Sequence, residues 1–381
     1  MSPSCTILKE RPRLAKGGMK TSIKRVLIYR IGSLGDTVVA LPSLHLVARA
    51  FPGSERRLLT NFPIQVKAPP AAAVLENTGL VDGYFRYSIG TRNPRELITL
   101  WWQLMRWRPG VLVYLTGPRG LKSARRDVLF FRLCGIRRMI GVPMTDDAQE
   151  NRVNPIDHTL EYEAERLARS IAELGDARLG DPQSWSLHLT TAEQARASEV
   201  HSLLDGRPLI SVNIGTKVQA NELGRENWGA LLARLAALYP THALAISGAA
   251  VDMETSEFIG EGWRQASASP SVVNLCGQLT PRESAAVFAR SQVFIGHDSG
   301  PMHLAAAVQT RCVAIFSARG KPRVWFPYGQ KHRVLYHRVN CWGCNLDTCI
   351  IEQKKCIASI TVDEVLAELR PILDASSAAN L

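Results

Sequence analysis

The amino-acid sequence predicts an α/β protein of two domains, each built on a parallel β-sheet covered by helices. At 381 residues, the chain is longer than one hydrophobic core normally organises. Short apolar runs of strand length alternate with helical segments, which is the pattern of a parallel sheet with crossover helices. This pattern starts near residue 25 and again near residue 209, on either side of the turn Gly180-Asp181-Pro182.

The individual elements follow in order from these runs. In the first half we expect a helix at about 37–50 and strands at 25–29, 57–60, 111–115 and 139–142. In the second half we expect a helix at 228–238 and strands at 209–213, 243–247, 272–275, 293–295 and 312–316. A last helix at 362–369 begins at the N-cap residue Thr361. The expected divisions are a flexible basic arm at 1–21, domains at 22–182 and 183–359, and a C-terminal helix and tail at 360–381.

Composition indicates a globular protein with an anionic partner. The hydrophobic fraction of 46% is ordinary, whereas the net charge of +12 favours nucleic acid, a phosphorylated lipid or polysaccharide, or an anionic membrane surface. No apolar stretch is long enough to cross a bilayer, and the N-terminus has no apolar signal core. We therefore expect a cytoplasmic protein.

The segment Gly296–Ala307 predicts an anion-binding site. It follows the apolar run 293–295, and Asp298 and Ser299 are good N-cap residues for the helix that comes next. A strand, a tight turn and a free helix N-terminus direct unpaired N–H groups and the helix dipole at one spot. A nucleotide diphosphate is the ligand we expect there.

The first strand ends in a second turn that carries Gly32, Gly35 and Asp36. Its glycines allow close approach to a ligand, but their spacing is not the dinucleotide fingerprint, which disfavours a dehydrogenase. Asp36 follows the carboxyl end of a strand, where open α/β sheets place their ligands. The alternative is that Asp36 only caps its helix.

The cysteines fall into two groups. Cys134, Cys276 and Cys312 sit in apolar runs and are predicted core residues. The late run Cys341, Cys344, Cys349 and Cys356 leaves three alternatives open: a structural zinc site, a disulfide pair, or a reduced packed loop. A cytoplasmic location disfavours the disulfide.

An aromatic and basic region follows in the first half. Three tryptophans, Trp101, Trp102 and Trp107, lie with Arg106 and Arg108 ahead of a series of basic residues, namely Arg119, Lys122, Arg125, Arg126, Arg132, Arg137 and Arg138. The region fits an anionic inner-membrane surface that holds a phosphorylated lipid acceptor. It also fits core tryptophans beside ordinary solvated arginines. No recognised nucleic-acid-binding motif accompanies it, so nucleic acid is not the expected partner.

Two segments together resemble a known family. The segment 30–42 (RIGSLGDTVVALP) is similar to the opening motif of the family 9 glycosyltransferases, the heptosyltransferase group. The segment Gly296–Ala307 resembles that family's nucleotide-sugar motif, and the two occur in the family's order. The resemblance implies a GT-B fold, with an acceptor-side and a nucleotide-sugar-binding Rossmann-like domain facing across a cleft and the last helix crossing back to the first domain. It also implies inverting transfer of a sugar, heptose from ADP-heptose, to a lipid-linked lipopolysaccharide-type acceptor, with no required cofactor and no catalytic metal.

The resemblance assigns roles to individual residues. Asp36 corresponds to the general base, and Gly32, Ser33 and Gly35 lie beside it on the acceptor side. The donor side comprises Thr216, Lys217, Asp298, Ser299, Gly300, Pro301, Met302 and His303. The chain departs from the family where Asn221-Glu222-Leu223 replaces the usual Lys-x-Trp, and Lys217 is our candidate for the missing lysine.

Two other functions stay open at this point. A nucleotide-sugar epimerase has a similar two-domain form. A non-catalytic basic α/β protein that binds an anionic polymer is consistent with the missing lysine.

Overall fold

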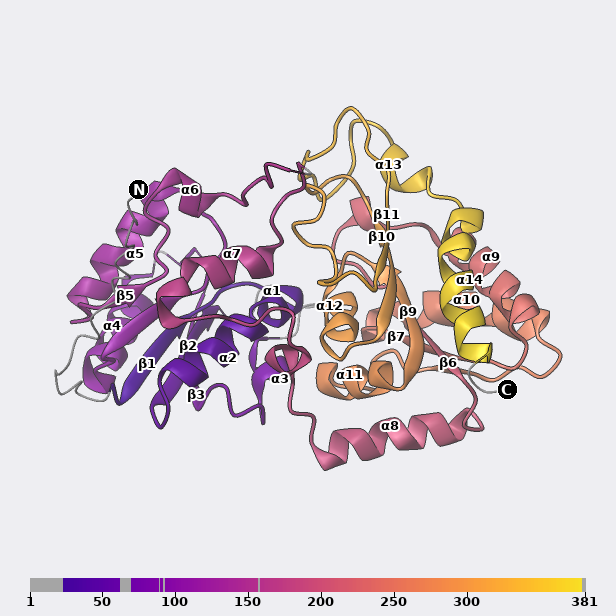
Figure 1. Cartoon of the computed structure of the whole chain (residues 1–381), viewed down its shortest axis with the longest axis horizontal. Helices are drawn as coiled ribbons and strands as arrows, with labels where there is room; N and C mark the ends of the chain where they lie inside the picture. Colours follow the sequence, from indigo (N-terminus) through magenta and orange to yellow (C-terminus); the bar gives the residue numbers. More distant parts are fainter. Residues whose placement is uncertain (1–22, 62–69, 89, 92, 157, 379–381) are drawn as a thin grey trace, which may run out of the picture.

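Two parallel β-sheets with helices on both faces lie next to each other along the long axis of the molecule (Figure 1). They are seen in a computed structural model that describes residues 23–61, 70–88, 90–91, 93–156 and 158–378. The basic arm predicted at 1–21 lies outside the described residues.

The first sheet has the strand order β3-β2-β1-β4-β5, with every pair parallel. Its strands are β1 (Arg25–Tyr29), β2 (Glu55–Asn61), β3 (Gly83–Tyr87), β4 (Val111–Tyr114) and β5 (Met139–Ile140). Its helices are α1 (Leu34–Val39), α2 (Leu41–Ala50), α3 (Ala72–Leu75), α4 (Pro94–Trp107), α5 (Leu121–Leu133), α6 (Asp146–Gln149) and α7 (Glu163–Ser170). Side chains of α1, α2, α3 and α7 pack on one face of this sheet, and those of α4 and α5 pack on the other. The apolar run of β1 is continuous because both of its faces are covered.

The helix expected at 37–50 is broken into α1 and α2. The break falls at Ala40, whose N–H donates to the Thr37 carbonyl three residues earlier at 3.2 Å. Pro42 has no N–H group to donate to the carbonyl four residues earlier, so the first helix cannot continue through it. The break leaves α1 as a short element at the carboxyl edge of β1.

The second sheet has the order β11-β10-β9-β6-β7-β8, again fully parallel. Its strands are β6 (Leu209–Asn213), β7 (Ala243–Ser247), β8 (Val272–Asn274), β9 (Ser291–His297), β10 (Arg311–Phe316) and β11 (Arg333–Tyr336). Its helices are α8 (Thr191–Leu203), α9 (Arg225–Leu238), α10 (Met253–Ala266), α11 (Pro281–Ala289), α12 (Gly300–Ala307), α13 (Lys355–Ala358) and α14 (Val362–Ala378). Side chains of α9, α10 and α14 share a core on one face, while α8, α11 and α12 pack on the other.

The two domains meet where α1 packs on α12. A Cβ atom added to Gly300 would lie 2.4 Å from Leu34 Cδ2, and one added to Gly35 would lie 2.9 Å from His303 Cδ2. The absence of a side chain at both glycines is therefore what allows this close approach. Arg282 of α11 makes a second contact between the domains, because its Nη1 donates to the Val74 carbonyl of the first domain. Glu193 of the second domain pairs with the same guanidinium at 2.5 Å.

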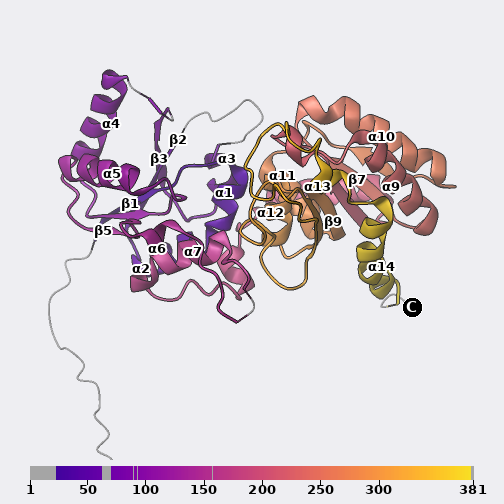
Figure 2. The same ribbon diagram turned by 90° about the horizontal axis from the view of Figure 1, so that it is seen from above.

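The last helix does not cross back to the first domain, contrary to our expectation. Helix α14 packs against α9, β9, β10 and β11 of the second sheet (Figure 2). Val365, Leu366, Leu369, Ile372 and Leu373 form its apolar stripe and are all buried in the second-domain core. The stripe has helical spacing and packs on β9, β10 and β11 beside α9, which fixes the helix on the second sheet.

Among the described residues, no helix combines the length and the apolar character that crossing a membrane requires.

Candidate active site

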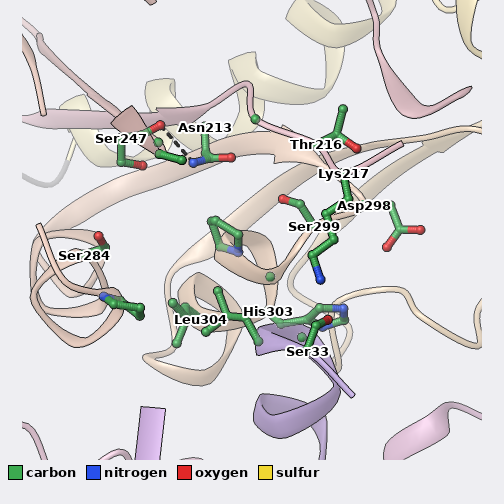
Figure 3. A pocket seen from close by; sticks show the side chains of 18 of the residues that line it. Ser33, Asn213, Thr216, Lys217, Ser247, Ser284, Asp298, Ser299, His303 and Leu304 are labelled. Carbon is green, nitrogen blue, oxygen red and sulfur yellow. Dashed lines mark hydrogen bonds between the residues drawn. The ribbon is translucent and has the colours of Figure 1, made fainter. Parts of the chain in front are cut away.

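A cavity of about 440 Å³ opens between the two domains, at the carboxyl ends of their strands. The first domain contributes Ser33, Leu34, Gly35 and Asp36, at the start of α1. The second domain contributes the loops after β6, β7, β8, β9 and β10 and the exposed ends of α11 and α12 (Figure 3). The cavity thus brings together the two motifs that sequence analysis singled out.

Asp36 lies at the first-domain side of the cavity with a fixed carboxylate. Its Oδ2 accepts hydrogen bonds from Ser33 N at 2.7 Å and from Ser33 Oγ at 2.9 Å. Its Oδ1 lies 3.6 Å from Nη2 of Arg30. The predicted capping role is therefore present, and it uses Oδ2, which leaves Oδ1 able to accept a further hydrogen bond.

Arg30 is a positioning residue that sequence analysis missed. Arg30 is 1% exposed, and its Nη1 donates to the Leu115 carbonyl at 2.6 Å, while Nη2 donates to the Asp36 carbonyl. Burial lowers the pKa of Arg30 from its ordinary value, and the nearby Asp36 opposes that shift. An arginine at the end of a buried strand, six residues before an aspartate, was the available signal.

Gly32 does not line the cavity but makes room for Asp36. Its backbone has φ +138°, and an added Cβ would lie 2.4 Å from Asp36 Cβ. Its N–H donates to Asn61 Oδ1 at 2.8 Å, which ties the turn to the end of β2. Ser33 and Gly35, the other two acceptor-side residues, do line the cavity.

Helix α12 points its N-terminus into the cavity. Asp298, Ser299, Gly300 and Pro301 all line it, and no side chain caps the helix. Ser299 Oγ is buried and has no hydrogen-bond partner in the part of the chain that the structure describes. Uncapped N–H groups and an unpartnered hydroxyl at a helix N-terminus suit an anionic ligand such as a phosphate.

Asp298 adds a titratable group at this N-terminus. Desolvation raises the pKa of its carboxyl to about 7; the Arg319 guanidinium opposes the rise and Asp36 adds to it. Asp298 is therefore close to half protonated at neutral pH.

Lys217 and Thr216 line the cavity from the loop after β6. Desolvation lowers the pKa of Lys217, and the negative charge of Asp36 opposes the shift. Asn221, where the family has its lysine, is 3% exposed; its Nδ2 donates to the Asp298 carbonyl at 3.4 Å, and Ser317 Oγ donates to its Oδ1. Asn221 thus lines the cavity and holds its loops together, and Lys217 is the lysine among the residues that line it.

Arg319 is the second strong cation among the residues that line the cavity, and sequence analysis missed it too. Its guanidinium donates to the carbonyls of Leu346 (2.7 Å) and Asn345 (3.0 Å) and pairs with Asp347 at 2.8 Å. These partners lie in the cysteine-rich loop, which therefore fixes the position of Arg319. Only the fold brings residues 319 and 345–347 together.

The two remaining donor-side residues behave differently. His303 lines the cavity, is 5% exposed, and stacks edge-on against Trp325. Burial lowers the pKa of His303 to about 4, so the imidazole is neutral at pH 7. Met302 does not line the cavity: it is 0% exposed and packs in the core on the sheet-facing side of α12.

An unpartnered acceptor lies deeper in the cavity. Asn213 is 3% exposed, and its Nδ2 donates to the Ser247 carbonyl at 2.8 Å (Figure 3). Its Oδ1 has no hydrogen-bond partner among the described residues. A buried acceptor without a partner costs free energy, which a hydrogen-bond donor on a ligand would recover.

The four late cysteines surround a small cavity of about 10 Å³ and form no disulfide. Among the described residues, no group of three or more histidine, cysteine, aspartate or glutamate side chains is placed to hold a metal ion. The structure therefore favours the reduced packed loop over the zinc site and the disulfide. Cys134, Cys276 and Cys312 are buried, as predicted.

Comparison with known proteins identifies related chains. The model of glycosyltransferase family 9 (heptosyltransferase) matches residues 150–355, just over half of the chain. Lipooligosaccharide heptosyltransferase 2 of Campylobacter jejuni is 31% identical over 103 residues, which are 27% of this chain and 32% of that protein. Lipopolysaccharide heptosyltransferase 3 of Escherichia coli is 44% identical over 50 residues, 13% of this chain and 15% of that protein. The matched part thus spans about a third or less of the length of these relatives.

Solved structures share the whole architecture. A family 9 glycosyltransferase from Veillonella parvula has a TM-score of 0.68 at 17% identity, covering 94% of this chain and all of the other. The E. coli ADP-heptose lipopolysaccharide heptosyltransferase II has a TM-score of 0.64 at 18% identity, covering 93% and 99%. An E. coli heptosyltransferase solved with ADP-2-deoxy-2-fluoro heptose has a TM-score of 0.57 at 16% identity, covering 91% and 99%. These likenesses confirm the expected GT-B fold of two facing α/β domains.

Proposed function

Since this chain belongs to glycosyltransferase family 9, the heptosyltransferase family, we propose that it transfers a heptose from ADP-heptose to a hydroxyl of a lipopolysaccharide core or a related glycan. The observation that carries the proposal is the single cavity in which Asp36 and the N-terminus of α12 face each other. One side suits a base and the other suits a diphosphate. The E. coli heptosyltransferase of the same fold, solved with a fluorinated ADP-heptose, supports the choice of donor.

Asp36 acts as the general base in this proposal. The acceptor hydroxyl binds beside Oδ1 and gives it a proton as its oxygen forms the new bond to the anomeric carbon. The bond between that carbon and the diphosphate breaks on the opposite face, so the configuration inverts and ADP leaves. Arg30 and Ser33 hold the carboxylate in place during this step.

The leaving diphosphate is held by the second domain. Its growing negative charge is met by the N–H groups at the start of α12, by Lys217 and by Arg319. These groups supply the charge stabilisation that a divalent cation gives in other enzymes, and the proposed mechanism uses no metal. In this proposal Asn213 Oδ1, which is buried without a partner among the described residues, accepts a hydrogen bond from the nucleoside.

The acceptor side of the proposal is a phosphorylated, lipid-linked glycan presented at the inner face of the inner membrane. The net charge of +12 suits such an anionic acceptor and membrane surface. In this proposal the protein works in the cytoplasm, and its anionic partner is this acceptor rather than nucleic acid.

The test is transfer measured with a panel of nucleotide sugars. Purified protein is incubated with ADP-heptose, ADP-glucose, UDP-glucose and GDP-mannose, each with and without a deacylated lipopolysaccharide core, and the products are analysed by mass spectrometry. We expect one heptose added to the core and ADP released only when ADP-heptose and acceptor are both present. Isomerisation of the donor in the absence of acceptor would identify an epimerase. If no nucleotide sugar binds, the protein is instead a non-catalytic binder of an anionic polymer.

A further inference from the structure

Helices α4 and α5 expose an apolar ridge at the outer end of the first domain. Its members are all more than a third exposed: Leu97 (38%), Ile98 (61%), Trp101 (38%), Trp102 (56%), Met105 (39%), Leu129 (60%) and Leu133 (63%). We call this set the α4–α5 ridge. Trp107 is the exception among the three neighbouring tryptophans, because it is only 7% exposed and belongs to the core. An exposed apolar set of this size on a soluble protein indicates a binding surface.

The ridge is one continuous surface. Helix α4 turns Leu100, Leu104 and Trp107 into the core, which leaves its opposite face outward. Trp101 Nε1 donates to the Leu133 carbonyl at 2.9 Å, so the middle of α4 lies against the end of α5. Figures 1 and 2 both place the two helices next to each other at the end of the molecule away from the second domain. A partner on the ridge therefore leaves the interdomain cavity open.

Positive charge surrounds the ridge. Residues 94–138 contain ten lysines and arginines and two acidic residues, a net charge of +8 against +12 for the whole chain. Both acidic side chains are engaged locally: Glu96 accepts a hydrogen bond from Thr91 Oγ1, and Asp127 pairs with Arg119 and Arg126. A further acid outside this segment, Glu173, lies 3.8 Å from Arg138. The exposed basic side chains are Arg95, Arg106, Arg108, Lys122, Arg125, Arg126, Arg132, Arg137 and Arg138.

We propose that the α4–α5 ridge docks this protein on an anionic phospholipid bilayer. Trp102 and Ile98 would enter the boundary between headgroups and acyl chains, while the surrounding arginines pair with lipid phosphates. The Arg106 guanidinium already lies 5.6 Å from the Trp102 ring centroid, so charge and apolar surface are adjacent. The inference rests on the proposed function in one respect, that the acceptor is carried by the bilayer.

Two other occupants fit the ridge less well. A nucleic acid would use the arginines and the tryptophan rings but would leave five aliphatic or thioether side chains without an apolar partner. A second copy of the chain would bring two segments of net charge +8 against each other. A bilayer with anionic headgroups satisfies both the apolar and the charged parts.

The experiment is vesicle flotation of the full chain without substrates. Vesicles of phosphatidylcholine are compared with vesicles that also contain phosphatidylglycerol, at about 0.1 M salt, where exposed charges still act over about 10 Å. One variant removes apolar surface (Ile98→Ser with Trp102→Ser), and another removes charge (Arg125→Gln with Arg132→Gln). The matched control removes two similarly exposed apolar side chains of the second domain, Leu203 (69%) and Phe258 (50%), as Leu203→Ser with Phe258→Ser.

We expect the wild type and the control to float with the phosphatidylglycerol vesicles only. The charge variant should bind about 25-fold more weakly, since each basic residue at an anionic surface contributes about fivefold. The apolar variant should bind these vesicles at least tenfold more weakly than the wild type. Circular dichroism and transfer to a deacylated, soluble acceptor should stay unchanged in both, which separates this surface from the transfer reaction.

Several outcomes would overturn the proposal. They are equal binding to neutral vesicles, no binding by the wild type, or ridge variants that float like the control. A ridge variant that changes only the oligomeric state would make the ridge an interface between copies. Displacement from the vesicles by a short RNA at a lower concentration than the lipid would favour nucleic acid.

Discussion

The pKa of Asp298 predicts that donor binding weakens as the pH rises through neutrality. Desolvation raises this pKa to about 7, so the side chain is neutral below pH 7 and negative above it. It lines the cavity beside the helix N-terminus where we place the diphosphate. A charged Asp298 would repel that diphosphate, so the neutral form binds the donor better.

The magnitude follows from this pKa. If only the protonated form binds, the apparent Kd for ADP-heptose rises about tenfold between pH 6 and pH 8, which is about 1.4 kcal/mol. The diphosphate of ADP-heptose carries no terminal phosphate that titrates in this range, so the ligand adds no pH dependence of its own. Isothermal titration calorimetry at half-unit pH steps measures the effect.

The Asp298→Asn variant is the control for this prediction. Its donor affinity should stay flat over the same range and match that of the wild type at pH 6. A raised carboxyl pKa also means that the wild type loses stability as the pH rises from the unfolded value near 4 to about 7. Asp298→Asn should therefore melt at a higher temperature than the wild type at pH 8, with a difference that shrinks toward pH 5. A flat wild-type profile, or a slope that survives in the variant, would refute the reasoning.

Two further variants test the two sides of the cavity. Lys217→Ala should weaken ADP-heptose binding about tenfold, which is the value of one charged hydrogen bond. Lys24→Ala, at the other end of β1, is the control and should leave the affinity unchanged. Equal affinities of the two variants by calorimetry would show that Lys217 does not replace the missing lysine. Gly300→Val places a side chain against Leu34, where even a Cβ would lie 2.4 Å from Cδ2, and should lower the free energy of unfolding by about 1–3 kcal/mol. Gly117→Val, where an added Cβ meets nothing within 4 Å, is its control, and equal melting temperatures for the two variants would contradict the tight contact of α1 with α12.

The fold was predictable wherever strands are buried on both faces. Strands β1, β6 and β7 match the predicted 25–29, 209–213 and 243–247 because an unbroken apolar run marks such a strand. The edge strands β3 and β11 were missed, since their sequences GYFRY and RVLY mix exposed polar with apolar residues. The packing of α14 was also missed, because its apolar stripe does not say which sheet it covers.

The site was predictable only where its residues are close in sequence. Asp36 and residues 298–301 lie in short motifs beside strand ends, and the fold brings them to one cavity. Arg319 depends on carbonyls of residues 345–346, and Arg30 on the Leu115 carbonyl, so tertiary contacts alone reveal them. Met302 lies within a motif but faces the core, because a helix turns only part of its first turn toward a ligand.

The central claim is that Asp36 is the base on one side of a cavity whose other side binds the donor. Its most direct test measures turnover and ADP-heptose affinity together for the Asp36→Asn variant. The control is Glu364→Gln, because Glu364 accepts a hydrogen bond from Thr361 N at 2.7 Å in an equivalent helix cap far from the cavity. We predict a loss of turnover of about 10²–10⁴-fold for Asp36→Asn, with donor affinity within about threefold of the wild type and an unchanged control. Turnover retained at the wild-type rate would contradict the claim.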